Sequence, residues 1–362
     1  MLQNLLLISL IYLINAQEWT LIPTTGTAPP PSSGYIAVKL GTTVVKYGGG
    51  IQGSGPNNTT YFNQTDLFDL VTHIWTPIVN ASPTGRIFAN AVALNDTHLI
   101  MYGGTQYFQV PLSVIVFDEY WLFDLTTTTW TQIYFTGTTP TPRFEHGMVY
   151  DAVGNNFYIW GGEQALNSTD LLVVNDMYKC SVDTLSCDLV IQIGDVPVPR
   201  VNLKIRNLDE KHFIASGGFS YTPTGAKSGL FIFDIKNNKW TREEFDVYDP
   251  EEKGRFPTPR DAGVFDIAND IIVIWGGDVD GSNYYNLVND TWSWNLQHNC
   301  GCGPICKENI WMYQDIPSPK SAKRVESVVY NDEIYTFGGL QAGNFIGPDI
   351  DTNEVNKYSP CS

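Results

Sequence analysis

A short apolar run that ends in two glycines occurs six times along this chain, and this repeat constrains the fold more than any other feature. The second glycines are Gly49, Gly104, Gly162, Gly218, Gly277 and Gly339, spaced by 55, 58, 56, 59 and 62 residues. Self-similarity at a near-constant period is the signature of an architecture that stacks copies of one structural unit. The 362 residues, enough for two or three average domains, are therefore predicted to form one domain of six units.

Each unit is predicted to contain four short strands. The glycine pair ends one strand, and a second apolar segment follows it, as at 66–70 (DLFDL), 120–125 (YWLFDL) and 230–235 (LFIFDI). Tryptophan stands six residues beyond an Asp in three units, at Trp75, Trp130 and Trp240. β-Branched and aromatic residues dominate these runs, whereas Gly, Pro, Asn, Asp and Thr separate them, which is typical of strands and turns.

Radial repetition of four-stranded sheets around an axis accounts for this spacing. One unit cannot cover both faces of its own sheet, so neighbouring units must cover them. The last unit stops after three strands, and the segment 18–23 (EWTLIP), which contains Trp19, has the pattern of the missing fourth strand. We therefore expect an all-β, six-bladed β-propeller whose last blade is closed by the N-terminal strand.

A Pro-rich turn precedes the first strand of five units and leads to a basic residue: Arg86, Arg143, Arg200, Arg260 and Lys320. This turn, the glycine pair, the Asp-aromatic strand and the spaced tryptophan together resemble the kelch repeat. The resemblance covers about residues 18–360, with departures at Cys187, which stands near an expected tryptophan, and in a Cys-rich insertion before Trp311. It implies a kelch-type propeller in which residues 17–362 form a single domain.

The start of the chain indicates secretion. Residues 1–16 (MLQNLLLISLIYLINA) contain an apolar run and end in Ala16, as a secretory signal peptide does. No other stretch reaches the roughly 18 unbroken apolar residues of a membrane-spanning helix. Seven Asn-x-Ser/Thr sites are candidates for N-glycosylation: Asn57, Asn58, Asn63, Asn80, Asn95, Asn167 and Asn289. We therefore expect an extracellular glycoprotein without a membrane anchor.

The six cysteines, an even number, are expected to form disulfides in an oxidising compartment. Cys180 ends the third strand of its unit and Cys187 begins the fourth, so the two face each other across a hairpin and should be bridged. The remaining four are Cys300, Cys302, Cys306 and Cys361, and several pairings among them are open. Zinc is the alternative for the run NCGCGPIC, but no nearby fourth ligand completes the usual spacing, so disulfides are favoured.

No catalytic or metal-binding constellation is evident, and no cofactor is predicted. The five histidines have no partners at metal-ligand spacing. The segment 278–283 (DVDGSN) is reminiscent of a calcium loop but lacks its distal Glu, so it is interpreted as a turn. Galactose oxidase and the plant specifier proteins use similar propellers, yet their copper and iron ligand sets do not match this sequence. A periplasmic sialic-acid mutarotase is similar in fold and length, which leaves a sugar mutarotase or isomerase as the enzymatic alternative.

Loops that follow the glycine pairs should converge around the axis on one face of the propeller. Candidates for ligand contact there are Tyr107, Glu163, Tyr221, Asp278, Asp280 and Gln341. Aromatic rings beside carboxylates and amides suit a sugar or a peptide anchor. The basic residues Arg86, Arg143, Arg200, Arg260 and Lys320 would form a positive ring if they pointed to the channel mouth, which would favour an anionic ligand. The kelch resemblance implies an alternative, in which such arginines bond the blade backbone and neighbouring carboxylates.

The formal net charge of −17, with 38 Asp and Glu against 21 Lys and Arg, limits the classes of partner that we expect. Nucleic acids and anionic membrane surfaces attract positive fields, so neither is an expected partner. These features favour a secreted binding or scaffold module for an extracellular protein or glycan. The alternatives are the sugar mutarotase or isomerase and a purely structural extracellular component.

Overall fold

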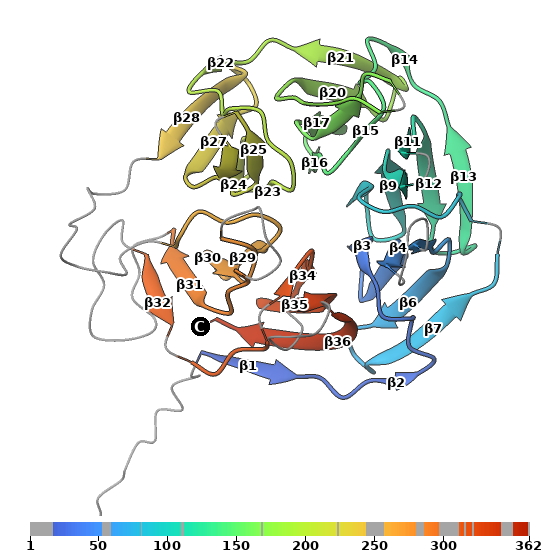
Figure 1. The fold of residues 1–362 in the computed structure, drawn as a ribbon, viewed down its shortest axis with the longest axis vertical. Coiled ribbons are helices and arrows are strands. Elements are labelled where there is room, and N and C mark those ends of the chain that lie inside the picture. Colours follow the sequence, from blue (N-terminus) through green and yellow to red (C-terminus); the bar gives the residue numbers. More distant parts are fainter. Residues whose placement is uncertain are drawn as a thin grey trace, which may run out of the picture.

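The glycine pairs directly follow the second strands of four antiparallel sheets, as the repeat predicts, and lie inside the second strands of the first and last sheets. The computed structural model describes residues 17–52, 59–80, 82–109, 112–167, 169–222, 224–243, 257–279, 286–296, 311–314, 316–320, 322–341 and 350–360. Within these ranges every regular element is a strand, and six sheets of four or more strands surround a common axis (Figure 1). The prediction of an all-β, six-bladed propeller is confirmed.

Four main strands make up each sheet. The first three sheets contain β3 (Ser33–Leu40), β4 (Thr43–Gln52), β6 (Thr65–Asp69) and β7 (Ile74–Ile78); β8 (Asn90–Ala93), β9 (His98–Tyr102), β12 (Tyr120–Asp124) and β13 (Thr129–Ile133); β16 (Gly147–Asp151), β17 (Asn156–Trp160), β20 (Met177–Ser181) and β21 (Ser186–Val190). The last three contain β23 (Lys204–Asn207), β24 (His212–Ser216), β27 (Leu230–Asp234) and β28 (Lys239–Glu243); β29 (Val264–Ala268), β30 (Ile271–Trp275), β31 (Thr291–Asn295) and β32 (Met312–Gln314); β34 (Glu326–Tyr330), β35 (Glu333–Gln341), β36 (Ile350–Ser359) and β1 (Glu18–Leu21).

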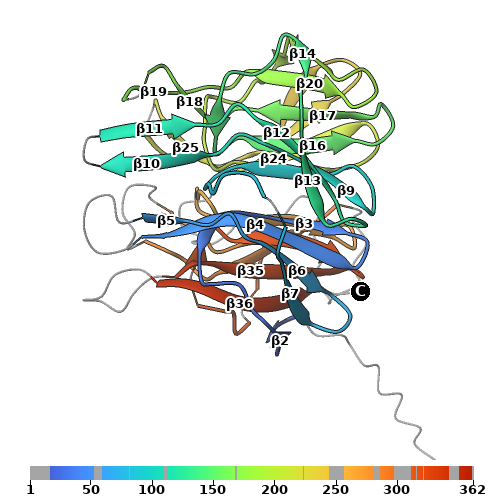
Figure 2. The ribbon, with the colours of Figure 1, turned by 90° about the vertical axis from the view of Figure 1, so that its right-hand side faces the viewer.

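Short strands extend or connect these sheets. Beyond the glycine pairs lie β5 (Thr59–Tyr61), β10 (Thr105–Gln109), β11 (Leu112–Val116), β18 (Glu163–Ala165), β19 (Leu171–Val173), β25 (Phe219–Tyr221) and β26 (Thr224–Ala226). The remaining strands are β2 (Thr25–Gly26), β14 (Thr136–Gly137), β15 (Arg143–Phe144), β22 (Ile193–Gly194) and β33 (Ala322–Lys323). Strands β5, β10, β11, β18 and β25 extend toward the same face of the molecule, on the left in Figure 2.

The N-terminal strand completes the sixth sheet. Strand β1 pairs antiparallel with β36, and Trp19 lies opposite Tyr358 in the register. Side chains of the first and sixth sheets also share one core, in which the rings of Phe68 and Phe337 are 5.5 Å apart. The two ends of the repeat series are therefore joined both by strand pairing and by side-chain packing.

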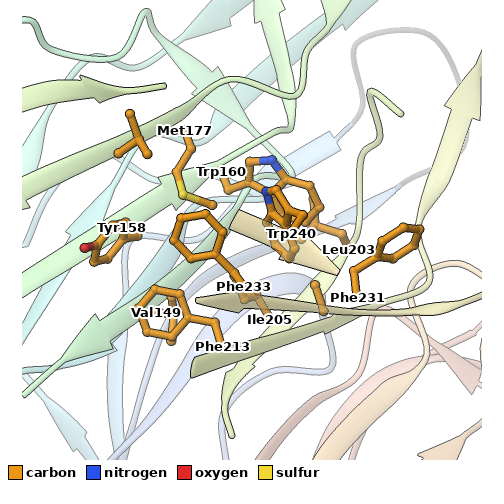
Figure 3. Packing of buried hydrophobic residues seen from close by; sticks show 12 residues of the cluster. Val149, Tyr158, Trp160, Met177, Leu203, Ile205, Phe213, Phe231, Phe233 and Trp240 are labelled. Carbon is orange, nitrogen blue, oxygen red and sulfur yellow. The ribbon is translucent and has the colours of Figure 1, made fainter. Parts of the chain in front are cut away.

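The cores lie between neighbouring sheets. Figure 3 shows one, in which side chains of the third sheet pack on those of the fourth. The rings of Trp160 and Trp240 are 4.7 Å apart there, and both side chains are fully buried. The three tryptophans of the sequence pattern, Trp75, Trp130 and Trp240, are all buried at equivalent places in the fourth strands. Burial of a large side chain of this kind contributes about 2–3 kcal/mol, so these tryptophans anchor the first, second and fourth sheets to the neighbouring sheets on which they pack.

Main-chain hydrogen bonds at the glycine pairs tie successive units together. The second glycine of five units donates its N–H to a carbonyl of the next unit: Arg86, Arg143, Arg200, Arg260 and Ala322, over 2.8–3.1 Å. The fifth partner corrects the register of the basic series, because the equivalent of the four arginines is Ala322 and not Lys320. The turn before the sixth sheet is longer by two residues, and Lys320 is exposed on it.

The predicted bridge between Cys180 and Cys187 is present, and the two residues lie opposite each other in β20 and β21. Cys300, Cys302, Cys306 and Cys361 lie outside the described residues, as do the segment 1–16, Asn57, Asn58 and Asp280. The five described glycosylation candidates are all exposed: Asn63, Asn80, Asn95, Asn167 and Asn289. In the described part of the chain no helix is long and apolar enough to cross a membrane.

Candidate functional site

One residue from each unit forms a ring around the axis. These six residues, called here the axial ring, all have a positive φ: Gly34, Phe88, Glu145, Asn202, Ala262 and Arg324. The Phe88 N–H donates to Gly34 O at 2.7 Å, and the Glu145 N–H donates to Phe88 O at 3.0 Å. The Asn202 N–H likewise donates to Glu145 O, and the Arg324 N–H donates to Ala262 O. A left-handed conformation costs a non-glycine residue about 1–2 kcal/mol, so these bonds help to hold it.

The channel along the axis narrows at this ring. The axial ring and its neighbours line a cavity of about 50 Å³. Away from the hairpins, the first strands of the six sheets line a wider cavity of about 620 Å³. In the wider cavity Arg206 Nε lies 3.1 Å from Asp266 Oδ1, and Glu326 Oε1 lies 2.8 Å from Nζ of Lys204, a residue of the smaller cavity. The other side of the axial ring faces the hairpins β10–β11, β18–β19 and β25–β26, and is called here the axial mouth.

Three carboxyl groups that have no close ion-pair partner among the described residues gather at the axial mouth. Glu145 belongs to the axial ring, Glu163 begins β18 opposite Phe144, and Asp261 directly precedes Ala262. Only 7% of Glu163 and 8% of Asp261 is exposed. The Asn202 amide lies 3.4 Å from Asp261 Oδ2, while Asp261 Oδ1 is buried and has no hydrogen-bond partner among the described residues. A buried oxygen in that state can accept a hydrogen bond from a ligand.

Burial raises the pKa of each of these carboxyl groups. The pKa of Glu145 rises to about 7, because burial and the charges of Glu163 and Asp261 outweigh the attraction of Arg324. Burial alone raises the pKa of Glu163 to about 7. For Asp261 the pKa rises to about 6, since burial and the charge of Asp278 outweigh Lys323 and Arg324. The mouth therefore loses protons and gains negative charge between about pH 5 and 8.

Two cationic side chains, Lys323 and Arg324, lie near the carboxyl groups of the axial mouth. Lys323 Nζ lies 2.9 Å from Asp278 Oδ2, and both residues are buried. The guanidinium of Arg324 lies over the ring of Phe88, 4.6 Å from its centre. Lys323 faces Asp261 and Asp278 from the sixth unit, so two acids share one lysine. The cations offset only part of the acidic charge.

Two tyrosines of the hairpins complete the axial mouth. The ring of Tyr107 packs edge-on against Phe144 at 5.6 Å, and the Tyr61 hydroxyl donates to Tyr107 O at 2.8 Å. Burial, and then the charges of Glu145 and Glu163, raise the pKa of Tyr107. Tyr221 is 55% exposed, and burial of its hydroxyl together with Glu163 raises its pKa to about 12. Both rings therefore lie within the electrostatic reach of the same carboxylates.

The structure brings together four of the ligand candidates taken from the sequence: Tyr107, Glu163, Tyr221 and Asp278. Gln341 ends β35 opposite Ala322 in the register, and its amide donates to Glu354 Oε2 at 3.3 Å. Asp280 lies outside the described residues.

The positive ring of basic side chains does not form. Arg86, Arg143, Arg200 and Arg260 are at most 5% exposed, and each donates to the backbone of its own sheet. Arg143 Nη1 donates to Gly161 O at 3.1 Å and to Asp176 Oδ1 at 2.7 Å. Arg86 and Arg260 pair likewise with Glu119 and Asp290. The arrangement is the alternative that the kelch resemblance implies, because a buried guanidinium needs carbonyl and carboxylate partners.

The sequence pattern did not single out Glu145, Asp261 or Arg324. Each follows the arginine position of its unit by one or two residues, so an alignment of the units on the ring register would have found them. His146, next in the chain, is 2% exposed, and both of its ring nitrogens lack partners among the described residues. Burial and Arg143 lower the pKa of His146 to about 3, so it stays neutral. No group of three metal-ligating side chains is present within the described residues.

Charge at the axial mouth should make the protein less stable as pH rises. A carboxyl whose folded pKa lies above its unfolded value stabilises the fold at low pH, and this contribution is lost as pH rises through the folded pKa. Glu163, with a folded pKa of about 7, should lose roughly 2–3 kcal/mol between pH 5 and 8. Glu163→Gln should reduce, by that amount, the change in the free energy of urea unfolding between pH 5 and 8. Glu210→Gln, on an exposed turn of the opposite face, should keep the wild-type slope; equal slopes for both variants would contradict the assignment.

Comparison with known proteins agrees with the architecture. The model of the KLHDC2/KLHL20/DRC7 Kelch-repeats domain matches residues 6–152 and 150–351. Acyl-CoA-binding domain-containing protein 4 of Arabidopsis thaliana is 24% identical over 95% of the chain and 47% of its own length. Kelch domain-containing protein 2 of Bos taurus is 27% identical over 64% of the chain and 59% of its own length. Host cell factor 2 of Homo sapiens is 21% identical over 70% of the chain and 31% of its own length. The chain spans about half the length of the first of these relatives.

Proposed function

The chain belongs to the kelch-repeat family, and from this premise we propose that it is a secreted module that binds an extracellular protein at its axial mouth. The family and its relatives indicate a protein-interaction scaffold. The observation that carries the choice of face is the buried Asp261 Oδ1, which has no hydrogen-bond partner among the described residues and whose carboxyl, like that of buried Glu163, acts on Glu145. Hydrogen-bond acceptors in this state favour a partner that brings donors.

The charge of the axial mouth defines the partner segment. In the part of the chain that the structure describes, Glu145, Glu163 and Asp261 are balanced at close range by Arg324 and by Lys323, which already pairs with Asp278. Tyr107 and Tyr221 supply flat apolar surfaces next to these acids. A loop or chain end with a Lys or Arg side chain would place its cation among the carboxylates and its aliphatic stem on the rings. We therefore propose a basic peptide segment as the ligand.

Three observations support the secreted state. Residues 1–16 have the pattern of a signal peptide, and Cys180 and Cys187 form a disulfide, which persists in oxidising compartments. The five described glycosylation candidates are accessible to a glycosyltransferase, since all are exposed. The proposed module is therefore an extracellular glycoprotein.

A peptide selection tests both parts of the proposal. The full chain is produced in a eukaryotic host, and the proposal requires it in the medium, with residue 17 at its N-terminus. Phage-displayed peptides that bind it should be enriched in Lys and Arg, and synthetic copies should bind Glu163→Gln and Tyr221→Ala about tenfold more weakly.

The matched control is Val153→Ala, which changes an exposed residue of a first-to-second-strand turn on the opposite face. It should bind the peptides as the wild type does. Equal affinity of all variants for the peptides, or selection of acidic peptides, would contradict the proposed site. A free sugar that binds the mouth and exchanges anomers faster with the protein would instead favour the mutarotase alternative, with Glu145 and Glu163 as the acid and base.

A further inference from the structure

The fourth unit breaks a charge pattern that its sister units keep. Three arginines of the repeat pair with a carboxylate that directly precedes the third strand of their sheet. These pairs are Arg86 with Glu119, Arg143 with Asp176, and Arg260 with Asp290, over 2.6–2.7 Å. In the fourth unit the residue before β27 is Gly229. Among the described residues no carboxylate pairs with Arg200.

Arg200 is nevertheless buried as deeply as its sisters. It is 3% exposed, and its Nε and Nη1 donate to Val198 O at 3.1 Å and Gly217 O at 3.0 Å. In the sister units the carboxylate receives further guanidinium N–H groups, such as Arg143 Nη2 at 3.1 Å from Asp176 Oδ2. The Arg200 guanidinium lacks that acceptor. A buried cation without a counter-charge is costly, so the position favours an external anion.

Open space replaces the missing side chain. A cavity of about 610 Å³, called here the fourth-sheet pocket, is lined by Arg200, Arg242 and Phe231. A Cβ at Gly229 would lie 3.3 Å from the Phe231 ring and 3.8 Å from Arg242 Nε, so the place of the absent carboxylate adjoins this pocket. Pockets of about 300–1,000 Å³ hold small organic ligands.

The fourth-sheet pocket combines cationic and apolar surfaces. Arg242 stands opposite Phe231 on β28, and Lys227 also lines the pocket. Among the described lining residues the one acid is Asp195, whose Oδ2 accepts the main-chain N–H of Arg242 at 3.2 Å. Burial, and then the charge of Arg242, lower the pKa of Arg200 to about 10, as expected where two cations face each other. The apolar part of the wall consists of residues 196–198, Ala226 and Phe231, and Ser228 adds a hydroxyl.

We propose that the fourth-sheet pocket binds a small apolar carboxylic acid, with its carboxylate between Arg200 and Arg242. The carboxylate would take the place that Glu119, Asp176 and Asp290 fill in the sister units. Arginine presents a planar fork of donors that matches a carboxylate, and such charge-assisted bonds are about twice as strong as neutral ones. The apolar part of the acid would lie on Phe231 and Pro197. This site is separate from the axial mouth, so either can fail without the other.

Isothermal titration calorimetry with 3-phenylpropionate tests this proposal on the full chain. The acid should bind the wild type, and its neutral amide, 3-phenylpropionamide, should not. Arg242→Gln, an exposed position on β28, should weaken binding by about tenfold or more. Lys239→Gln removes a cation from the same strand outside the pocket lining and should bind as the wild type does.

A second pair of variants tests Arg200, the buried cation of the fourth-sheet pocket. Arg200→Gln should abolish binding, with circular dichroism to verify the fold, whereas Arg260→Gln in a sister unit should leave binding intact. No binding of 3-phenylpropionate to the wild type would overturn the proposal, as would equal affinities of Arg242→Gln and Lys239→Gln. Inorganic sulfate that competes as well as the acid would also overturn it, because the apolar wall would then contribute nothing.

Discussion

Replacing Arg143 with alanine should lower the free energy of unfolding by about 3–4 kcal/mol. The substitution removes two hydrogen bonds to backbone carbonyls and the paired contact with Asp176. It removes the Arg143 donor from Gly161 O and leaves Asp176, 29% exposed, without its cation, whereas Thr141 O keeps the Tyr102 hydroxyl as a donor. Urea unfolding followed by tryptophan fluorescence measures the loss.

Arg200 supplies the matched comparison for this prediction. Its guanidinium makes the equivalent backbone hydrogen bonds but has no carboxylate partner among the described residues. Arg200→Ala therefore leaves no described carboxylate without its cation. The loss for Arg200→Ala should therefore be smaller by about 1–2 kcal/mol. Equal losses at the two positions would show that the ion pair contributes nothing, and a loss below about 1 kcal/mol at Arg143 would contradict the structural role of the arginines.

Replacing Gly162 with alanine should cost about 3–5 kcal/mol or prevent folding. Gly162 has a φ of +88°, and an added Cβ would lie 2.7 Å from both Phe144 O and His146 Cβ. Both atoms belong to the segment that leads into β16, the first strand of the same sheet, and a main-chain oxygen and a Cβ cannot move aside cheaply. The expected result is a much lower midpoint of urea unfolding, or recovery of the variant only as aggregate.

The control for Gly162 is another glycine in the left-handed region. Gly225 has a φ of +130°, and nothing lies within 4 Å of the place of its Cβ. Gly225→Ala should therefore cost only the backbone strain, about 1–2 kcal/mol. Similar losses for the two variants would mean that backbone strain alone explains the glycine, and that the close approach of Phe144 and His146 does not matter.

The architecture could be predicted because its signals are local and repeated. The glycine pairs, the tryptophans of the fourth strands and the position of Trp19 each report one strand, and six repeats make the pattern specific. The bridge between Cys180 and Cys187 follows from the same strand register. Such features need no knowledge of how distant segments meet.

The candidate site could be predicted only in part, because its geometry depends on contacts between units. Tyr107, Glu163, Tyr221 and Asp278 follow the glycine pairs, and the repeat register places them on one face. Whether a repeated arginine points outward or into its sheet depends on acceptors such as Gly161 O, which a linear pattern does not reveal. Glu145 and Asp261 are likewise marked only by their place in the axial ring.

The turn before the sixth sheet shows how a small insertion misleads a spacing argument. Lys320 continues the spacing of the four arginines, yet the hydrogen bond from Gly277 goes to Ala322, two residues later. The register is set by the bonds between units, and the longer turn carries Lys320 into solvent. The missing fifth arginine is also a reason why no positive ring could be complete.

Hydrogen exchange with and without the tightest selected peptide tests the central claim, that partners bind at the axial mouth, most directly. Binding there should slow amide exchange in β10, β18 and β25 and at the axial ring, and leave the turns at 152–155 and 209–211 unchanged. Slower exchange confined to those turns, on the opposite face, would contradict the claim.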